Sequence, residues 1–334
     1  MPEGDTVLRT ARRLHEALAG LPLLDADLRW PGLSTANLRG MTVLEVIARG
    51  KHVLTRLDSG WTLHSHLRME GQWRVERTAG AASMGNAWMP AAGSVSGRPS
   101  ATGKGEPRSD PPLQRSRAAG PGPYRASLVT HPDVRAILVG PEWTAIGLRL
   151  GMLDLVRTDQ EHTLVGHLGP DILDPDFDLG RAVANLAASQ VPIGAALLDQ
   201  RNLGGIGTLW SSETLFVERV DPWTAADQLG REVLTRLVDR ARRLMLANTA
   251  FAIQSSTGNR VEGQTSYVHA RSGRPCRRCG GTVRVAAIGP PTQERTMFYC
   301  PGCQGGLAPT DDGRPLAPLG ARRREVPGKR GLGP

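Results

Sequence analysis

The sequence predicts an α+β protein of several domains: a β-sandwich with a flanking helix, a helical domain and a short C-terminal β-hairpin. Three observations lead to this prediction. Segments of alternating apolar residues, separated by glycine-containing turns, recur in the first 150 residues. From about residue 178 the apolar residues follow a helical spacing. All four cysteines lie between residues 276 and 303.

The first domain is expected to begin with a helix from Asp5 to about Leu18. Its apolar residues Val7, Ala11, Leu14 and Leu18 are spaced four, three and four residues apart, which places them on one face. Asp5 precedes this stripe and is the expected N-cap. The stripe predicts a helix that flanks the sandwich along one side.

Short strands are expected between about Leu23 and Val75, and again at 124–131 and 134–140, where apolar and β-branched residues alternate with polar ones. Between these regions the chain is rich in Ala, Gly, Ser and Pro and has almost no branched apolar residues. Such a composition buries too little apolar surface to fold. We therefore expect a disordered insertion at 78–123.

Four helical segments follow, at 178–189, 192–201, 208–218 and 231–248, joined by short turns that contain Pro or Gly. The cysteines come after them, and the end of the chain is rich in Pro, Gly and Arg. The expected domains are a β-sandwich over 1–150, a helical domain over 151–261, a cysteine-containing finger over 262–304 and a disordered tail over 305–334.

The formal net charge of +9 and the pI of about 10.2 favour a polyanionic partner, with nucleic acid before an acidic membrane surface. No apolar run is long enough to span a bilayer, and the first residues lack the apolar core of a signal peptide. We therefore expect no membrane partner and a cytoplasmic, nucleoid-associated location.

The cysteines have the spacing C-x2-C-x20-C-x2-C, formed by Cys276, Cys279, Cys300 and Cys303. Each C-x2-C turn can direct two thiolates at one tetrahedral ion, so the spacing indicates a zinc site. Four thiolates leave no open position, which predicts one structural Zn²⁺. The alternatives are two disulfides or free thiols, but a disulfide framework would spread its cysteines along the chain. No redox cofactor is expected.

The chain starts with Met1-Pro2-Glu3, which offers a nucleophile and a proton carrier side by side. Removal of Met1 would leave Pro2 with a free secondary amine, and α-amines titrate near neutrality. Such an amine can attack a sugar carbon and form a Schiff base, while Glu3 can transfer protons. Taken alone, these residues favour the alternative, in which the dipeptide is an ordinary N-terminus.

Six motifs together give the sequence a resemblance to the formamidopyrimidine-DNA glycosylase/endonuclease VIII family, and to its actinobacterial endonuclease VIII-like branch in particular. The resemblance runs from residue 2 to about 304, without the insertion. The motifs are MPEGDTV (1–7), RGKHV (49–53), HSHLRMEGQWRV (64–75), HLGPDIL (167–173), LLDQRNLGGIGTLWSSETLF (197–216) and CRRCGG…RTMFYCPGCQ (276–304).

The resemblance implies roles for individual residues. Pro2 matches the family nucleophile, and Glu3 matches the carboxylate that assists sugar ring opening. Lys51 matches a lysine needed for base removal that contacts a phosphate near the lesion, although a lysine in a turn is often only solvated. Arg295 matches a zinc-finger arginine that holds the phosphates flanking the flipped nucleotide.

Two further positions match with more difficulty. Met69 corresponds to a residue that enters the gap left by the extruded base, although a core methionine on a strand is an alternative. Thr208 stands in the helix–two-turns–helix element where the family usually has Asn on a phosphate, so reach and geometry differ. Asp5 and Thr6 stand where the family often has a second acid.

The resemblance implies a bifunctional glycosylase and AP lyase of base excision repair. It would bind damaged double-stranded DNA as a monomer, remove oxidised bases and nick the strand by β,δ-elimination. The MPEG start and the HLRMEG context favour oxidised pyrimidines as its substrates. One alternative is an abasic-site lyase with weak glycosylase activity, suggested by Thr208. The other is a non-catalytic zinc-dependent DNA-binding protein.

Overall fold

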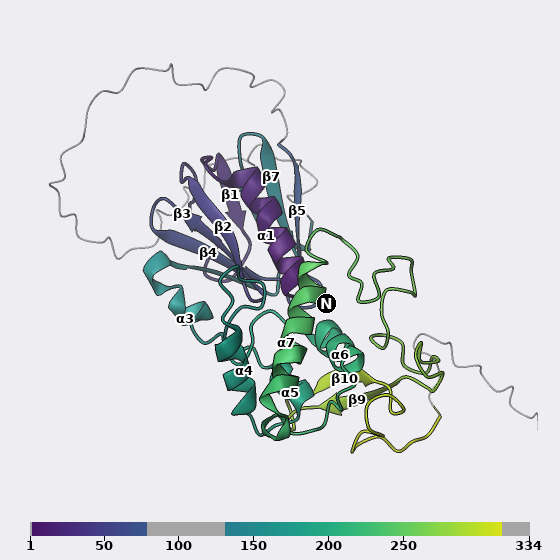
Figure 1. The fold of residues 1–334 in the computed structure, drawn as a ribbon. Coiled ribbons are helices and arrows are strands. Elements are labelled where there is room, and N and C mark those ends of the chain that lie inside the picture. The colour runs from purple at the N-terminus through teal and green to yellow at the C-terminus, as the bar shows by residue number, and fades with distance from the viewer. Residues whose placement is uncertain (1, 79–130, 316–334) are drawn as a thin grey trace, which may run out of the picture. The chain divides into compact units, whose positions relative to one another are not determined.

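The computed structural model of the chain describes residues 2–78 and 131–315. It divides into two compact units, Met1–His167 and Leu168–Pro334, whose helices and strands are drawn in Figure 1. Each unit has its own apolar core. Apart from Thr78, the insertion expected at 78–123 lies outside the described residues, and so does the strand expected at 124–131 except for its last residue.

The first unit contains two four-stranded antiparallel sheets, with the orders β1-β6-β7-β5 and β2-β3-β4-β8. Among the described residues, the chain leaves the second sheet after β4 and returns to it with β8, so the two sheets are interleaved in sequence. The strands are β1 (Asp25–Leu28), β2 (Val43–Arg49), β3 (His52–Leu57), β4 (Trp61–His66), β5 (Gln72–Arg77), β6 (Val134–Val139), β7 (Trp143–Leu148) and β8 (Met152–Arg157).

Helix α1 (Gly4–Leu18) shares one core with both sheets and packs against β2, β3, β5 and β7. Its predicted stripe is confirmed, since Val7, Leu14 and Leu18 are no more than 1% exposed. The prediction of Asp5 as N-cap is wrong: Glu3 is the N-cap, and Asp5 is buried in the first turn. A carboxylate there still faces the positive end of the helix dipole.

Strand β8 pairs with β4 along its whole length, so it completes the second sheet. The first unit therefore continues to His167, past the boundary expected after residue 150. A 3-10 turn, η2 (Thr158–Gln160), and the short helix α3 (His162–Val165) close the unit. Arg56 on β3 holds this end in place through two hydrogen bonds to Glu161, at 2.8 and 2.7 Å.

The second unit begins with helices at each of the four predicted segments. These are α4 (Leu179–Ala187), α5 (Ile193–Leu198), α6 (Thr208–Val217) and α7 (Arg231–Leu246), with a 3-10 turn η3 (Ala226–Gln228) before the last. Helix α4 packs against α5 and α7, and α6 packs against α5 and α7. No helix among the described residues is both long and apolar enough to cross a bilayer.

The predicted hairpin is formed by β9 (Arg284–Ile288) and β10 (Arg295–Tyr299), with β10 lying against α6 (Figure 1). The chain beyond it, expected to be disordered from residue 305, packs on the hairpin as far as residue 314. Asp311 forms a buried ion pair with Arg284 and accepts a hydrogen bond from the Tyr299 hydroxyl at 2.5 Å. Residues 316–334 lie outside the described part.

Candidate active site and metal centre

The N-terminal residues combine an accessible amine position with a buried carboxyl group. Pro2 is half-buried, and the Glu3 side chain next to it is 1% exposed. The carbonyl oxygen of Glu3 accepts the first helical hydrogen bond of α1, from the backbone N–H of Val7 at 3.0 Å. Both residues therefore lie at the positive end of the α1 dipole, which disfavours protonation of an adjacent amine.

Lys51 occupies a two-residue hairpin turn between β2 and β3, where Arg49 and His52 form the closing pair. Gly50, the first turn residue, has a φ of 59°. A left-handed residue at the first position is the requirement of a type II′ hairpin, and glycine meets it without strain. The RGKHV motif thus fixes the backbone that presents Lys51, which is itself half-buried.

A cluster of histidines lies beside Lys51 at the adjoining ends of β3 and β4. His52 pairs across the strands with His66, and its ring also stacks on His64 at a centroid distance of 5.0 Å. The cluster continues to His167, whose ring lies edge-on at 6.4 Å from that of His52. Sequence reasoning missed this cluster, although HSH in the quoted motif places two histidines on one face of a strand.

The hydrogen bonds of this cluster determine its tautomers. Asp154 on β8 can only accept, so Nδ1 of His64 donates to it at 2.8 Å. Nε2 of a neutral His64 is then an acceptor, and it receives the Nδ1 proton of His52 at 2.8 Å. Nδ1 of His66 accepts from the backbone N–H of Arg68 at 2.9 Å, which leaves the proton of a neutral His66 on Nε2.

The histidines are held neutral by their surroundings. Burial, together with the neighbouring His66, His64, His167 and Lys51, lowers the pKa of His52 to about 3. Burial and the charges of His64, Lys51 and Arg68 lower the pKa of His66 to about 4. Burial also lowers the pKa of His64, against the opposing effect of Asp154. Near neutral pH His52, His64 and His66 therefore offer hydrogen bonds rather than charge beside Lys51.

Met69 lies in the turn between β4 and β5, and 66% of its surface is exposed. The alternative of a core methionine on a strand is therefore wrong. The turn is tight, because a Cβ on Gly71 would come within 2.3 Å of the Leu67 carbonyl oxygen. Arg68 in the same turn has a φ of 51°. The turn presents an apolar side chain to solvent on a constrained backbone.

Thr208 is the first residue of α6, directly after the glycine-rich turn that follows α5. Gln200 organises this turn: its side-chain amide donates to the carbonyl oxygens of Leu198 and Ile206 at 3.0 Å each, and its oxygen accepts from Gly205 at 3.0 Å. The half-buried Thr208 therefore stands at a helix N-terminus, where backbone N–H groups favour an anion.

Arg295 is the exposed first residue of β10 and pairs with Ile288. Most of the other arginines near the cysteines are engaged within the protein. Arg271, Arg277 and Arg278 donate to backbone carbonyl oxygens, and Arg284 is paired with Asp311. Within the described residues, Arg274 and Arg295 make no side-chain hydrogen bond or ion pair.

Glu213, in the middle of α6, is a second residue that sequence reasoning missed. Its side chain is fully buried. The carboxylate accepts backbone N–H groups of Tyr267, Val268 and His269 at 2.8, 2.8 and 2.7 Å, and also the hydroxyl of Ser256. Glu213 thus fastens the chain leading to the finger onto α6. The sequence signal that could have identified Glu213 is that it is the one acidic residue in the stretch LWSSETLF.

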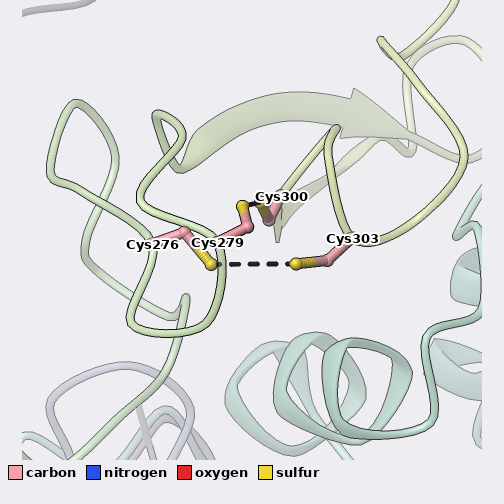
Figure 2. Close-up of side chains that lie close together, drawn as sticks. All are labelled: Cys276, Cys279, Cys300 and Cys303. Atoms are coloured by element: carbon pink, nitrogen blue, oxygen red, sulfur yellow. Dashed lines mark hydrogen bonds between the residues drawn. The ribbon is translucent and has the colours of Figure 1, made fainter.

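The four cysteine sulfurs converge, as predicted, from two turns at the base of the hairpin (Figure 2). None of them is in a disulfide. All four sulfurs lie within 4.8 Å of one another, and the pairs Cys279–Cys300 and Cys276–Cys303 are separated by 3.5 and 3.9 Å. Thiolates at about 2.3 Å around one tetrahedral zinc ion would be about 3.8 Å apart. The sulfur set therefore fits a single metal ion of that kind.

The structure gathers the candidate residues into two groups. Pro2, Glu3, Lys51 and Met69 belong to the first unit, whereas Thr208, Arg295 and the four cysteines belong to the second. Phe216 and Val268 pack with three of the cysteines, Cys276, Cys300 and Cys303, in one apolar cluster, so the metal site and the helical part share a core.

Comparison with known proteins agrees with this division. The family profile of the formamidopyrimidine-DNA glycosylase N-terminal domain matches residues 1–99, and that of the formamidopyrimidine-DNA glycosylase H2TH domain matches residues 168–259. A probable endonuclease 8 2 of Streptomyces coelicolor is 42% identical over 94% of this chain and 98% of its own length. The DNA-(apurinic or apyrimidinic site) lyase Nei2 of Mycolicibacterium smegmatis is 33% identical over 91% and 99%.

Solved structures show the same architecture. Lactococcus lactis formamidopyrimidine-DNA glycosylase, crystallised with DNA containing an AP site, superposes with a TM-score of 0.64 at 20% identity, over 91% of this chain and 99% of that one. Two interleaved sheets, an H2TH element and a four-cysteine hairpin define a class of DNA repair glycosylases. The chain belongs to the formamidopyrimidine-DNA glycosylase/endonuclease VIII family, whose members are DNA glycosylases and AP lyases of base excision repair.

Proposed function

We propose that this chain is a bifunctional glycosylase that removes oxidised bases from duplex DNA, with pyrimidines favoured, through a Schiff base on Pro2. The observation that carries the proposal is the fully buried Glu3 directly beside Pro2 at the positive end of α1. A carboxyl group held beside a secondary amine is placed to accept and deliver the protons that a Schiff-base reaction moves.

In this mechanism the neutral amine of Pro2 attacks C1′ of the damaged nucleoside after Met1 has been removed. The bond between C1′ and the base breaks, and the base leaves with a proton from solvent, while Glu3 takes the proton that the Pro2 amine loses. Glu3 delivers a proton to O4′ as the sugar ring opens and the iminium forms. Loss of a C2′ proton then expels the 3′ phosphate, a δ-elimination expels the 5′ phosphate, and water releases the sugar fragment from Pro2.

The remaining residues are proposed to hold the DNA. Lys51 and Arg295 would each bind backbone phosphate, Arg295 through a guanidinium fork that fits two oxygens. Thr208 would donate its hydroxyl to a phosphate at the N-terminus of α6. The exposed Met69 would enter the stack where the damaged base has left, which offsets part of the cost of unstacking.

Zinc is proposed as the ion held by Cys276, Cys279, Cys300 and Cys303. Four thiolate ligands would leave no coordination position open, so the ion would stabilise the fold and take no part in the reaction. The metal would fix the base of the hairpin whose far strand carries Arg295. In this way the finger would take part in DNA binding without contributing a reacting group.

Borohydride trapping tests the reaction. The protein, with loss of Met1 checked by mass, is incubated with duplexes that carry an oxidised pyrimidine, an oxidised purine or an abasic site. We expect a covalent complex on the pyrimidine and abasic substrates, at least tenfold weaker for Pro2→Gly and Glu3→Gln. The control is Glu16→Gln, an exposed carboxylate on the same helix. Absence of any complex while duplex binding persists would leave only the non-catalytic binder.

A second candidate function is an abasic-site lyase with weak base removal. It is favoured by Thr208 at a position where the family usually has Asn, and by the naming of the 33% identical relative as an AP lyase. Trapping on the abasic substrate alone, with all lesions inert, would support it. A Thr208→Asn variant that gains activity on damaged bases would identify the cause.

A further inference from the structure

A basic cavity lies in the second unit, between the C-terminal half of α7 and the loop at 255–260. Its volume is about 340 Å³, and its walls include Arg240, Arg243 and Arg260. No carboxylate is among its lining residues. None of the motifs that define the family site includes these three arginines.

Two of the three arginines are not paired with a carboxylate among the described residues. Arg240 donates to Glu218 at 2.7 Å, so its charge is already matched. Arg243 is exposed, and within the described residues neither it nor Arg260 has a carboxylate partner. The guanidinium of Arg260 lies 3.4 Å from the centre of the Phe251 ring, and its buried Nε has no hydrogen-bond partner.

The neighbouring acid does not cancel this charge. Ser256 lines the cavity and donates to Glu213, but that carboxylate is fully buried and already accepts three backbone N–H groups. An arginine fixed on an aromatic ring has little freedom left to lose on binding, so its remaining N–H donors are oriented in advance. The charges around the cavity are therefore positive on balance, which favours the binding of an anion.

The end of α7 would normally oppose an anion, because the last carbonyl oxygens carry the negative end of the helix dipole. Here those oxygens are occupied. The backbone N–H of Ala247 donates to the Arg243 oxygen at 3.1 Å, and the side-chain amide of Asn248 donates to the Leu244 oxygen at 2.8 Å. Asn248 also bonds Ser255 in both directions, at 3.0 and 2.8 Å, which fixes the loop across the cavity.

We propose that this cavity is a phosphate-binding site, in which the guanidinium groups of Arg243 and Arg260 bind the oxygens of one phosphate group. The same chemistry is presented by a backbone phosphate of DNA and by a free phosphorylated small molecule. The DNA source rests on the proposed function, whereas the small-molecule source is independent of it. In either case the site adds a contact that lies outside the family's recognised motifs.

The first test uses inorganic pyrophosphate and the full chain without DNA, with binding measured by calorimetry. We expect one site, weakened at least tenfold in the double variant Arg243→Gln/Arg260→Gln and partly retained in Arg243→Lys/Arg260→Lys. Arg236→Gln is the matched control, since Arg236 lies on the same helix but pairs with Glu232 and Glu218. Thermal unfolding of each variant checks that the fold is kept.

The second test measures binding to an undamaged duplex as a function of salt. If a DNA phosphate fills the site, the slope of log K against log salt should decrease by about 0.9 in the glutamine double variant and remain unchanged in Arg236→Gln. A weakened pyrophosphate site with an unchanged slope supports the small-molecule source.

The proposal is overturned if pyrophosphate binding and the salt slope both match wild type in the double variant, or if Arg236→Gln weakens both equally. Failure of borohydride trapping with pyrophosphate binding intact would remove the proposed reaction but leave the phosphate site standing.

Discussion

At the scale of single residues, the histidine cluster of the first unit is arranged around hydrogen bonds instead of positive charges. Asp154, His64 and His52 form a chain whose directions follow from the carboxylate being an acceptor only. The chain ends beside Lys51, so its neutral state keeps further positive charge away from that lysine. This order has a direct consequence for stability.

Stability should decline as the pH falls from about 6.5 toward 4. The pKa of His52 is about 3 and that of His66 about 4 in the folded protein, so the unfolded chain binds protons first over this range. Each such histidine can contribute a slope of about 1.4 kcal/mol per pH unit. Thermal unfolding between pH 7.5 and 5 measures it, and His52→Gln should flatten the profile by about one proton.

The control for this profile is His162→Gln, an exposed histidine in α3 of the same unit. It should leave the slope as in wild type. An unchanged slope in His52→Gln would mean that this histidine already protonates near its ordinary pKa in the folded protein.

Glu213 leads to a prediction about the second unit. Glu213→Gln would replace one accepting oxygen by an amide donor that faces backbone N–H groups, in a site with no exposure. We expect a loss of about 2 kcal/mol in the free energy of unfolding, because charged hydrogen bonds to buried donors disappear. Urea denaturation measures it, and Glu232→Gln, whose side chain is 89% exposed, should change stability by less than about 0.5 kcal/mol.

At the scale of elements, the segment after the second cysteine pair fastens the hairpin β9–β10. Asp311 accepts from Arg284 on β9 and from the hydroxyl of Tyr299 on β10, and that hydroxyl accepts the backbone N–H of Ala308. One carboxylate thus joins both strands to the following segment. The hydrogen bonds with Arg284 lower the pKa of Asp311 to about 2.

Asp311→Asn should destabilise the finger by about 3 kcal/mol, since it leaves the buried guanidinium of Arg284 without its countercharge. The lowered pKa of Asp311 means that this contribution is complete above about pH 4 and disappears as the pH falls toward 2. The measurement is the rate of metal loss to a chelator at pH 7. Asp312→Asn, an exposed neighbour paired with Arg314, should lose metal at the wild-type rate.

Many of the helices, strands and turns could be predicted from the sequence, because they depend on periodicity and spacing. The stripe on α1, the four helices of the second unit and the converging cysteines needed only local pattern. Pairing across long separations was not accessible in the same way: β8 joins β4, and Asp311 meets Arg284. The same limit applies to the hydrogen bonds of the arginines near the finger. Several of their partners are backbone carbonyl oxygens, which every residue carries, so the sequence does not identify them.

The site shows the same contrast. The motifs identified Pro2, Glu3, Lys51 and Arg295 as candidate site residues. The structure adds that Gly50 shapes the turn that presents Lys51, and that the Glu3 side chain is buried. The histidine cluster and Glu213 were missed because each acts through partners that lie far away in sequence. A motif records which residues are present, but not which backbone groups they hold.

At the scale of the whole molecule, the candidate residues are divided between two compact units with separate cores. The proposed nucleophile, the proton carrier and the phosphate-binding Lys51 lie in the first unit, and Thr208, Arg295 and the metal site lie in the second. Cys276, Cys300 and Cys303 belong to an apolar cluster of the second unit. Loss of the metal should therefore affect the two units differently.

A strong zinc chelator should abolish or lower one thermal transition and spare the other. The finger is short, and its buried apolar side chains belong to two five-residue strands and the turns beside them, so metal binding is expected to supply much of its folding free energy. The two sheets of the first unit contain no cysteine and should keep their β-sheet circular dichroism. Calorimetry of the full chain measures the transitions, with one zinc per chain expected by elemental analysis beforehand.

Restoring zinc should bring back the lost transition, and Cys276→Ser should reproduce the chelated state without chelator. Duplex binding should weaken in parallel, since Arg295 and Thr208 lie in the affected unit. If the sheets melted together with the finger, the cores would not be independent, and the division of roles between the units would have to be abandoned. If neither transition moved, the four thiols would be packing as apolar groups, and their tetrahedral spacing would have no metal to explain it.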